Sequence, residues 1–453
     1  MTKALPRVLI AGTSSGCGKT TAVCALLTLM RRRGVRVTAA KCGPDYIDPM
    51  FHETALGVPS ANLDPFFCDG NLLRALLAEQ QGTLSVIEGV MGYYDGTGAD
   101  GTENSTYTVA RETDTPAVLV VNGRGASASL LAVLEGFLNF TPASGIRGVL
   151  FSGMTAMTYS LVKRLAKERF GERITLLGFI PRLPEDCVLP SRHLGLVTAG
   201  ELENLRAILE RIADLCEREH SVDLDALLAL AASAPALEFE PREIPRVDGV
   251  RLALARDAAF CFIYPDTLRL FEKMGAEILP FSPLNDEAVP SSADGLLLPG
   301  GYPELYAERL EKNETFRLSV KRAVLAGMPT IAECGGFQVL GSSLDGHEMC
   351  GLLPHESRNT GKLVRFGYCT LTSGTDGLLG PAGTTLRAHE FHYYDSTDNG
   401  RGMTAAKPNG KSWECAVHTE TLYAGYPHLF LPSALPSAEA FCRKCLAFKE
   451  KRT

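Results

Sequence analysis

A glycine-rich segment near the start of the chain has the residue types of a phosphate-binding loop. Residues 12–21 read GTSSGCGKTT and lie between an apolar run and a segment with helical periodicity. Backbone N–H groups of such a loop, together with the N-terminus of the following helix, bind phosphate oxygens. Lys19 would reach the β- and γ-phosphates, and the Thr20 hydroxyl would bind Mg²⁺. The nucleotide-binding residues predicted on this pattern are Ser15, Gly16, Gly18, Lys19, Thr20 and Thr21.

The loop departs at one position from the strict pattern G-x-x-x-x-G-K-T. Thr13 stands where that pattern has its first glycine. The remaining GxGKT, placed between a strand and a helix, still predicts a nucleotide site. The alternative is a glycine-rich turn in which Lys19 is merely solvated.

Acidic residues follow two further apolar runs and would complete this site. Glu88 ends the run LSVI, where a metal-coordinating carboxylate would face the phosphates. Asp45 and Asp48 lie in KCGPDYIDP, directly after the apolar run at 35–40. Because the carboxyl ends of parallel strands share one edge of a sheet, we predict ligand or substrate roles for both aspartates. An ordinary strand-end acid and a simple turn are the alternatives.

A cysteine between a predicted strand and a predicted helix has the setting of a nucleophile. PTIAECGGFQVL (329–340) leads from an apolar run through Cys334 and two glycines into a helix. Such an elbow exposes the nucleophile at the carboxyl edge of the sheet. The helix N-terminus is expected to lower the pKa of the thiol, and the backbone N–H of Gly335 is placed to bind an oxyanion. Gly301, in LLLPGGYPEL, is a second candidate oxyanion donor. A buried strand-end cysteine is the alternative.

A cysteine nucleophile needs a base, and three histidines are candidates. His428 lies in LYAGYPHLFLPS, after a short predicted strand, whereas His389 and His392 lie in AHEFHYYD. HEFH is not H-E-x-x-H, so zinc-protease chemistry has no support. The spacing of these residues does not distinguish among the three.

The composition is that of an ordinary globular protein. The chain has 453 residues, which predicts two or three domains at roughly 150 residues each. Its 45 Lys and Arg and 52 Asp and Glu give a net charge of −7, with one short basic cluster at 31–33. Nucleic-acid and membrane partners are therefore not expected. We expect a soluble cytoplasmic protein, and the sequence leaves open whether it forms a homo-oligomer.

Thirteen cysteines are scattered along the chain. Without a recognisable signal peptide, such cysteines are mostly reduced and buried. Cys442 and Cys445 have C-x-x-C spacing but no second pair or nearby histidine at zinc spacing. The run FCRKCLAF is also typical of one face of a helix. Core packing is therefore preferred over a metal or redox role.

Short apolar runs alternate with helical patterns along the chain. In the first half the runs lie at 7–12, 35–40, 84–89, 116–121, 146–151 and 174–180. A second alternation has runs at 250–255, 276–281, 294–301 and 329–336. Each alternation is typical of an α/β domain, and the first predicts a parallel sheet with helices on both faces. We predict a nucleotide-binding domain over 1–232, a proline-containing linker over 233–248, and a second α/β domain over 249–453.

Taken together, these motifs resemble the cobyrinic acid a,c-diamide synthase family. Its members join an ATP-dependent ligase domain, similar to dethiobiotin synthetase, to a flavodoxin-like class I glutamine amidotransferase domain. The resemblance covers nearly the whole chain, and KCGPDYIDP is its most informative segment because the related cobyric acid synthases differ there. The motifs that carry it are GTSSGCGKTT, KCGPDYIDPMFH, NLDPFF, EGVMGYYDG, PGGYPELYA, AECGGFQVL, HEFHYY and YAGYPHLF.

The resemblance implies roles for individual residues. It makes Cys334 the glutaminase nucleophile and His428 the group that activates it. It matches Lys19, Thr20 and Glu88 to the positions that bind nucleotide and Mg²⁺, with Asp45 as a further metal ligand. The residues that would line the substrate side of the ligase site are Asp45, Tyr46, Asp48 and Asp95.

Two sites depart from what relatives often have, namely position 430, which is often a second His in relatives, and the pair Ser152-Gly153. The family lacks the acid that follows the histidine by two residues in other class I amidotransferases, and Phe430 agrees with that. Ser152 and Gly153 stand where relatives often have Asn after the fifth strand, so base contacts there are not predicted.

The family's reaction is one that these residues could carry. ATP would phosphorylate a tetrapyrrole carboxylate, and ammonia from glutamine would displace the phosphate from the a and c acetate groups. Ammonia would travel as uncharged NH₃, which implies a route between the domains. Hydrogenobyrinic acid and nickel-sirohydrochlorin are alternative substrates that share the motifs. A regulatory protein with a dead amidotransferase module is disfavoured, because both Lys19 and Cys334 are present.

Overall fold

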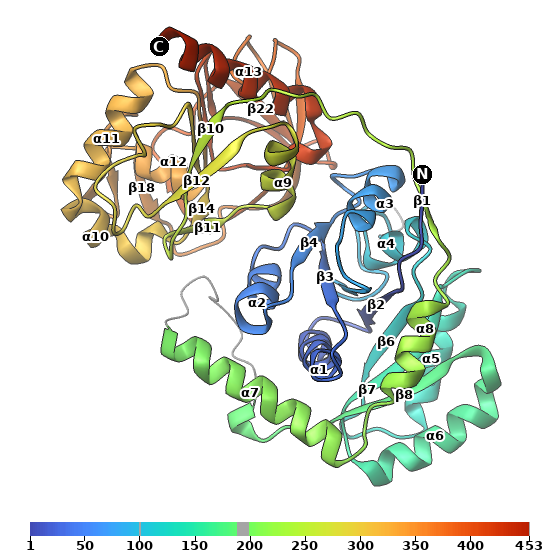
Figure 1. The fold of residues 1–453 in the computed structure, drawn as a ribbon. Coiled ribbons are helices and arrows are strands. Elements are labelled where there is room, and N and C mark those ends of the chain that lie inside the picture. The colour runs from blue at the N-terminus through green and yellow to red at the C-terminus, as the bar shows by residue number, and fades with distance from the viewer. Residues whose placement is uncertain (99–100, 188–198, 453) are drawn as a thin grey trace. The chain divides into compact units, whose positions relative to one another are not determined.

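A computed structural model describes residues 1–98, 101–187 and 199–452 (Figure 1). The chain divides into two compact units, Met1–Pro241 and Arg242–Thr453. The division falls inside the predicted linker, and part of that segment forms a strand. There β9 (Leu237–Glu238) pairs with β1 (Thr2–Lys3), because Leu237 has a hydrophobic surface to bury. No helix in the described residues is long and apolar enough to cross a membrane.

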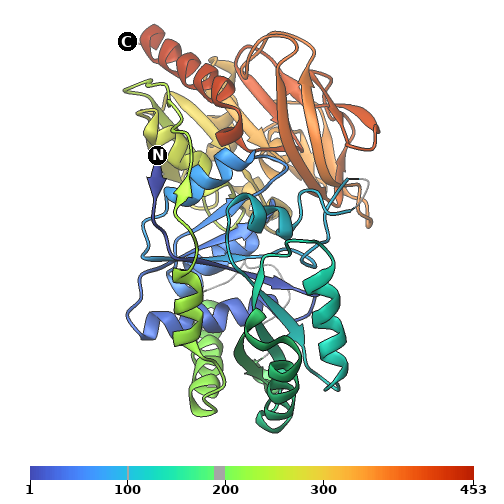
Figure 2. The ribbon, with the colours of Figure 1, turned by 90° about the vertical axis from the view of Figure 1, so that its right-hand side faces the viewer.

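The first unit is built on a seven-stranded sheet (Figures 1 and 2). Its strands are β2 (Arg7–Gly12), β3 (Val37–Cys42), β4 (Ser60–Leu63), β5 (Leu84–Glu88), β6 (Ala117–Asn122), β7 (Ile146–Met154) and β8 (Thr175–Pro181). Their order is β4-β3-β5-β2-β6-β7-β8, and every pair is parallel. The chain leaves the central β2 toward β3 on one side and later reaches β6 on the other. That switch point is where ligands bind in open parallel sheets.

Helices cover both faces of this sheet. All six residues of β2 are buried, and because side chains alternate along a strand, both faces must be covered. Val8 and Ile10 pack with the buried faces of α1, α2, α7 and α8. The predicted parallel sheet with helices on both faces is confirmed. The helices are α1 (Lys19–Arg32), α2 (Ile47–Leu56), α3 (Gly70–Ala78), α4 (Thr106–Glu112), α5 (Ser129–Asn139), α6 (Ala156–Phe170), η1 (Gly171–Arg173), η2 (Glu185–Cys187), α7 (Ala199–Arg218) and α8 (Leu224–Ala232).

The second unit contains a six-stranded sheet. Its strands are β10 (Arg251–Ala255), β12 (Glu277–Phe281), β13 (Gly295–Leu298), β15 (Thr330–Glu333), β24 (Val417–His418) and β25 (Leu422–Gly425). The order is β12-β10-β13-β15-β25-β24, with only the β24 edge antiparallel. Numbered along the chain, the five parallel strands run 2-1-3-4-5, the order of a flavodoxin-like sheet. The predicted fold class of this domain is confirmed.

Helices pack on both faces of this sheet as well. α9 and α13 share one hydrophobic core with Leu252, Leu297 and Ile331, whereas α10, α11 and α12 share another. Cys442 and Cys445 are fully buried in the first of these cores, with free thiols, as packing residues should be. The helices are α9 (Pro265–Lys273), η4 (Pro303–Tyr306), α10 (Ala307–Lys312), α11 (Glu314–Leu325), α12 (Gly335–Leu340), η5 (Leu431–Ser433) and α13 (Leu435–Arg452).

Three further sheets in this unit were not predicted. Five antiparallel strands form the largest: β19 (Arg365–Ser373), β20 (Thr385–His392), β22 (Met403–Ala406), β23 (Ser412–Cys415) and β26 (His428–Leu429). A second contains β16 (Ser343–Leu344), β17 (His347–Glu348), β18 (Glu356–Asn359) and β21 (Tyr394–Ser396). The third pairs β11 (Phe260–Phe262) with β14 (Gly300–Gly301). The first matters for function, because β26 begins with His428.

Candidate active sites

The glycine-rich loop joins β2 to α1 at the centre of the first sheet. Gly16 and Gly18 have φ of 74° and 98°, backbone angles that favour glycine. Lys19 is the first residue of α1, and its Nζ donates to Ser14 O at 3.0 Å and to Met91 O at 2.5 Å. Its ammonium therefore lies against the loop backbone, where phosphates of a nucleotide would bind.

The end of β7 contacts this loop through a hydrogen bond. Ser152 Oγ donates to Cys17 O at 2.6 Å. An added Cβ on Gly18 would lie only 3.0 Å from Ser152 Cβ, so the two backbones are close. Ser152 thus holds the phosphate loop.

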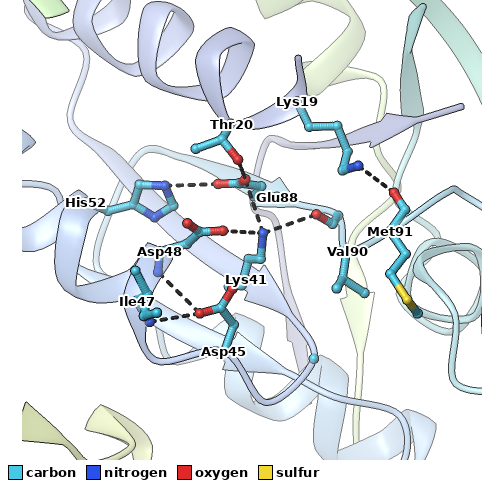
Figure 3. A network of polar contacts seen from close by, with 12 residues as sticks. Lys19, Thr20, Lys41, Asp45, Ile47, Asp48, His52, Glu88, Val90 and Met91 are labelled. Atoms are coloured by element: carbon cyan, nitrogen blue, oxygen red, sulfur yellow. Dashed lines mark hydrogen bonds and ion pairs between the residues drawn. The ribbon is translucent and has the colours of Figure 1, made fainter. Parts of the chain in front are cut away.

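Glu88, the last residue of β5, is the centre of a buried polar network (Figure 3). Thr20 Oγ1 donates to Glu88 Oε1 at 2.8 Å, and Lys41 Nζ lies 3.1 Å from the same oxygen. His52 Nε2 lies 3.1 Å from Glu88 Oε2. Burial alone would raise the pKa of Glu88, but Lys41 and His52 outweigh it and hold that pKa well below its usual range. Glu88 is therefore negatively charged, and its contacts with Thr20, Lys41 and His52 fix the orientation of its carboxylate.

The two aspartates after β3 take different positions in the same network (Figure 3). Asp48 forms an ion pair with Lys41, while burial, and then the charge of Glu88, raise the pKa of Asp48 to about 7. Asp45 Oδ1 accepts from the backbone N–H groups of Ile47 at 2.8 Å and of Asp48 at 3.4 Å. Asp45 thereby fixes the start of α2, next to the buried Tyr46.

The loop after β5 runs beside the phosphate loop. Tyr93 N–H donates to Gly12 O at 2.8 Å. Asp95 accepts from Gly92 N–H at 2.8 Å, and its charge acts on Lys19. The structure thus gathers the predicted ligase residues at the carboxyl edge of β2, β3 and β5.

Lys41 and His52 were missed as members of this site. Lys41 lies opposite Glu88 in the β3–β5 register and is 4% exposed, and His52 is fully buried. Lys41 could have been found from its place near the end of a fully buried strand, because a buried lysine needs a partner of opposite charge. His52 also lies 3.3 Å, through Nδ1, from Ser60 Oγ. The partner strand β4 that supplies Ser60 was not predicted.

In the second unit, Cys334 lies on a strained elbow between β15 and α12. Its φ is 48° and its ψ is −102°, a backbone conformation that residues other than glycine rarely adopt. Cys334 N–H donates to Gly425 O at 2.7 Å, which helps to hold the elbow. A Cβ on Gly336 would lie 2.0 Å from Leu298 O, so only glycine fits this turn. This is the backbone geometry of a nucleophile elbow.

The two predicted oxyanion donors lie next to each other. The backbone N–H of Gly335 hydrogen-bonds the Cys334 thiol. The ideal Cβ position of Gly335 is 3.3 Å from Gly301 N. A Cβ on Gly301 would lie 2.1 Å from Ala259 O, so the strand bearing this second N–H cannot carry a side chain there. The backbones of the two glycines are therefore neighbours beside the nucleophile, as two donors of one oxyanion hole must be.

The expected low pKa of the nucleophile is not found. Burial, followed by the charge of Glu304, raises the pKa of the Cys334 thiol, and the Gly335 N–H opposes this only in part. The prediction from the helix N-terminus was wrong because α12 has only six residues and the thiol is desolvated. A base must therefore take the proton when the substrate arrives.

Among the three candidate bases, His428 shares a small space with Cys334. The ideal Cβ position of Gly300 lies 3.2 Å from His428 Nε2 and 3.3 Å from Cys334 Cβ. His392 has both ring nitrogens engaged, with Tyr394 O at 2.6 Å and Glu390 Oε2 at 3.1 Å.

His389 is a poor base for a different reason. Burial lowers its pKa to about 3, and the charges of His428 and Lys407 act in the same direction. It therefore holds a proton weakly at neutral pH. Taken with the engaged nitrogens of His392, this geometry favours His428 as the base.

The missing side chain of Gly300 offers a direct check of this arrangement. A methyl group there would meet His428 Cε1 at 2.5 Å. Gly300→Ala should displace the imidazole and lower glutamine hydrolysis by about 10²-fold, the size expected when a catalytic group is misplaced. Gly374→Ala, at a glycine of the same unit without positive φ whose added Cβ would meet only Gly402 O at 3.7 Å, controls for the loss of a glycine elsewhere. Unchanged glutamine hydrolysis in Gly300→Ala would contradict the geometry.

Comparisons with known proteins agree with this division of the chain. Residues 8–197 match the CobQ/CobB/MinD/ParA nucleotide binding domain, and residues 251–435 match the CobB/CobQ-like glutamine amidotransferase domain. A cobyrinate a,c-diamide synthase of Listeria monocytogenes serotype 4b is 40% identical over 437 residues, covering 93% of this chain and 96% of the relative. The chain belongs to the cobyrinate a,c-diamide synthase family.

Other members of the cobyrinate a,c-diamide synthase family match almost as well. The cobyrinate a,c-diamide synthase of Salmonella typhimurium is 39% identical over 438 residues, covering 93% of this chain and 94% of the relative. A hydrogenobyrinate a,c-diamide synthase of Mesorhizobium japonicum is 39% identical over 401 residues, covering 87% and 90%. The predicted family is confirmed. The two names leave the macrocycle to be decided by experiment.

Proposed function

We propose that this chain catalyses the ATP-dependent, glutamine-hydrolysing amidation of the a and c acetate carboxylates of cobyrinic acid. The observation that carries the proposal is the pairing, in one chain, of the Lys19–Glu88 site with the Cys334–His428 site. The first has the groups for activating a carboxylate with a nucleotide, and the second has the groups for releasing ammonia from an amide. The proposed partners are ATP, glutamine and a tetrapyrrole.

In the proposed ligase step, a substrate carboxylate oxygen attacks the γ-phosphorus of ATP and ADP leaves. Lys19 and the loop N–H groups hold the phosphates and offset the negative charge of the transition state. Asp45, Tyr46, Asp48 and Asp95 are proposed to orient the acetate group. Ammonia then attacks the acyl phosphate, and phosphate leaves with the C–O bond electrons to give the amide.

The donor set around Glu88 suits Mg²⁺. Mg²⁺ is bound in such sites by one or two carboxylates, a hydroxyl and substrate phosphates. Thr20 Oγ1 and the Glu88 carboxylate lie 2.8 Å apart, and Asp45 has a second carboxylate oxygen to offer. When bound, the ion would neutralise phosphate charge. We propose Thr20, Glu88 and Asp45 as its protein ligands.

In the proposed glutaminase step, Cys334 gives its proton to His428 and attacks the amide carbon of glutamine. The N–H groups of Gly301 and Gly335 hold the resulting oxyanion. The proton returns from His428 to the departing nitrogen, so NH₃ leaves uncharged and a thioester remains. Water then hydrolyses the thioester to glutamate with His428 as base.

A panel of macrocycles tests this function. The enzyme is incubated with ATP, Mg²⁺ and glutamine and with cobyrinic acid, hydrogenobyrinic acid or nickel-sirohydrochlorin, and products are identified by mass. We expect two successive amidations of cobyrinic acid. Diamidation of the metal-free acid alone would move the assignment to the reaction named for the Mesorhizobium relative. No amidation of any macrocycle would refute the proposal.

Alkylation of Cys334 tests the assignment of the base. His428→Ala should slow iodoacetamide labelling of Cys334 at pH 7 and abolish glutamine hydrolysis, because the thiol loses the imidazole that takes its proton. Amidation with added ammonium salt should survive. His389→Ala and His392→Ala should leave the pH–rate curve of labelling nearly unchanged, since one is a weak proton acceptor and the other is engaged. A curve that moves in either of these variants but not in His428→Ala would assign the base elsewhere.

A further inference from the structure

A carboxylate lies on the far side of the His428 ring from Cys334. Glu333, the last residue of β15, places Oε2 3.4 Å from His428 Nδ1. Its other oxygen, Oε1, accepts from the backbone N–H of Leu429 at 3.0 Å. The β15–β25 pairing sets this up, because Glu333 lies opposite Gly425, three residues before the histidine. Glu333 is thus tied to the strand that carries His428.

This pair is largely removed from bulk solvent. Glu333 is 9% exposed and His428 is 4% exposed. The Glu333 side chain borders a cavity of about 20 Å³ that is lined largely by apolar groups, among them Leu297, Ile331 and Leu431. A charge pair is stronger in such surroundings than in solvent. The attraction between the Glu333 carboxylate and a charged His428 ring is therefore stronger here than it would be in solvent.

The position that holds an acid in other class I amidotransferases is not available for one. Phe430 is 1% exposed, and its ring packs edge-on against Tyr264 with centroids 5.1 Å apart. It belongs to the hydrophobic interior. The imidazole still needs a group to fix its tautomer, since Nδ1–H must point away for Nε2 to accept the thiol proton.

The structure assigns this positioning role to Glu333, supplied by the residue before the nucleophile instead of by the segment after the histidine. This inference rests on the proposed glutaminase function. The Glu333 carboxylate accepts the Nδ1–H of His428 and stabilises the imidazolium that forms when Nε2 takes the Cys334 proton. The carboxylate itself stays ionised, and no proton passes to it. At 3.4 Å the contact is long for a hydrogen bond, as catalytic hydrogen bonds often are in unliganded enzymes.

Other charged groups also face this centre and must be separated from Glu333. The charges of Glu304, on η4, of Glu390, on β20, and of Glu333 itself all raise the pKa of the Cys334 thiol, so the test must show that the effect of Glu333 on the imidazolium exceeds its repulsion of the thiolate. His389 is paired with His428 across β20 and β26, and Lys407 acts on His389. Glu390 provides the matched control, because it is a buried carboxylate that acts on the same thiol and its Oε2 is bonded to His392.

The sign of a pH shift distinguishes positioning from mere proximity. Removing a carboxylate that only repels the thiolate should move the alkylation curve of Cys334 to lower pH. Removing one that stabilises the imidazolium partner should move the curve to higher pH, because transfer of the thiol proton to His428 becomes less favourable. We expect the second result for Glu333→Gln and the first, or no shift, for Glu390→Gln.

The experiment uses the full chain with Glu333→Gln, Glu333→Asp and Glu390→Gln. Glutamine hydrolysis, ammonium-dependent amidation and the pH–rate curve of iodoacetamide labelling are measured for each. Glu333→Gln should lower kcat for glutamine about 10²-fold with little change in KM, within the range of positioned acid–base catalysis. Glu333→Asp should restore part of that loss, and ammonium-dependent amidation should remain as in the wild type.

Each outcome decides the assignment. A curve that moves to lower pH in Glu333→Gln, or an unchanged kcat, overturns it. If Glu333→Gln does not fold, Glu333→Asp decides the assignment. A wild-type labelling curve together with a kcat between that of the wild type and zero supports the assignment. A folded but inactive Glu333→Asp refutes it. Failure of wild-type amidation with ammonium would refute the proposed function instead, because the alkylation curve needs neither ATP nor macrocycle.

Discussion

Replacing Cys334 by serine is expected to abolish glutamine-dependent amidation and to leave amidation with added ammonium salt intact. The serine hydroxyl is not ionised by a neighbouring imidazole in this thiol-adapted site, so the covalent step stops. Loss of a covalent nucleophile lowers kcat by roughly 10⁶-fold, which removes detectable glutamine hydrolysis. Product mass with each nitrogen source is the measurement.

The controls for this variant keep the interpretation simple. Cys442→Ala removes a buried thiol from the core and should retain both activities. ATP binding by Cys334→Ser should equal that of the wild type, because the phosphate loop belongs to the other unit. If a folded, ATP-binding Cys334→Ser also lost ammonium-dependent amidation, the division of labour between the two sites would be wrong.

Local patterns were enough to predict the elements that carry most of the chemistry. The glycines at 16 and 18 need positive φ, and the elbow at Cys334 needs two glycines after it, so these sequences permit few other structures. The apolar runs before them are buried on both faces, which is why they read as continuous strands.

The antiparallel part of the second unit could not be predicted in the same way. β19 and β20 pair over eight residue positions, but their exposed face carries aromatic residues such as Phe366 and Phe391, so polar and apolar residues do not alternate clearly. β4 has only four residues, reading SANL, and lacks β-branched residues. Strands of this kind are specified by their neighbours and not by their own sequence.

The partners of the functional groups were hidden for a related reason. Lys41, His52 and Glu333 act through residues that are far along the chain, and a contact with a partner 36 or more positions away leaves no local signal. The raised pKa of Cys334 likewise follows from burial, which the sequence does not state. Residue type and spacing therefore find the groups that meet substrate more readily than the groups that position them.

Lys19→Ala and Glu88→Ala are expected to lose amidation with either nitrogen source, by about 10²–10³-fold or more, because each removes charge stabilisation at the phosphates. ADP release and product mass are measured with glutamine and with ammonium salt. Lys167→Ala and Glu172→Ala, at exposed positions of the same unit, are the matched controls and should behave as the wild type. Wild-type rates with ammonium in Lys19→Ala and Glu88→Ala would mean that the phosphates bind elsewhere.

Glu88→Ala also has a cost in stability, which must be separated from its effect on catalysis. It leaves the buried Lys41 with Asp48 as its remaining carboxylate partner, and breaking a buried ion pair costs about 3–5 kcal/mol. Glu88→Gln keeps an oxygen for Thr20 and a side chain of the same size beside His52, but removes the charge. In Glu88→Gln the amide oxygen can still accept a hydrogen bond from Lys41, which alanine cannot. The melting temperature of Glu88→Gln should therefore fall less than that of Glu88→Ala. Its amidation rate should fall as far, since a neutral amide is a poor ligand for Mg²⁺. Full amidation by Glu88→Gln would show that Glu88 serves the fold and not the metal.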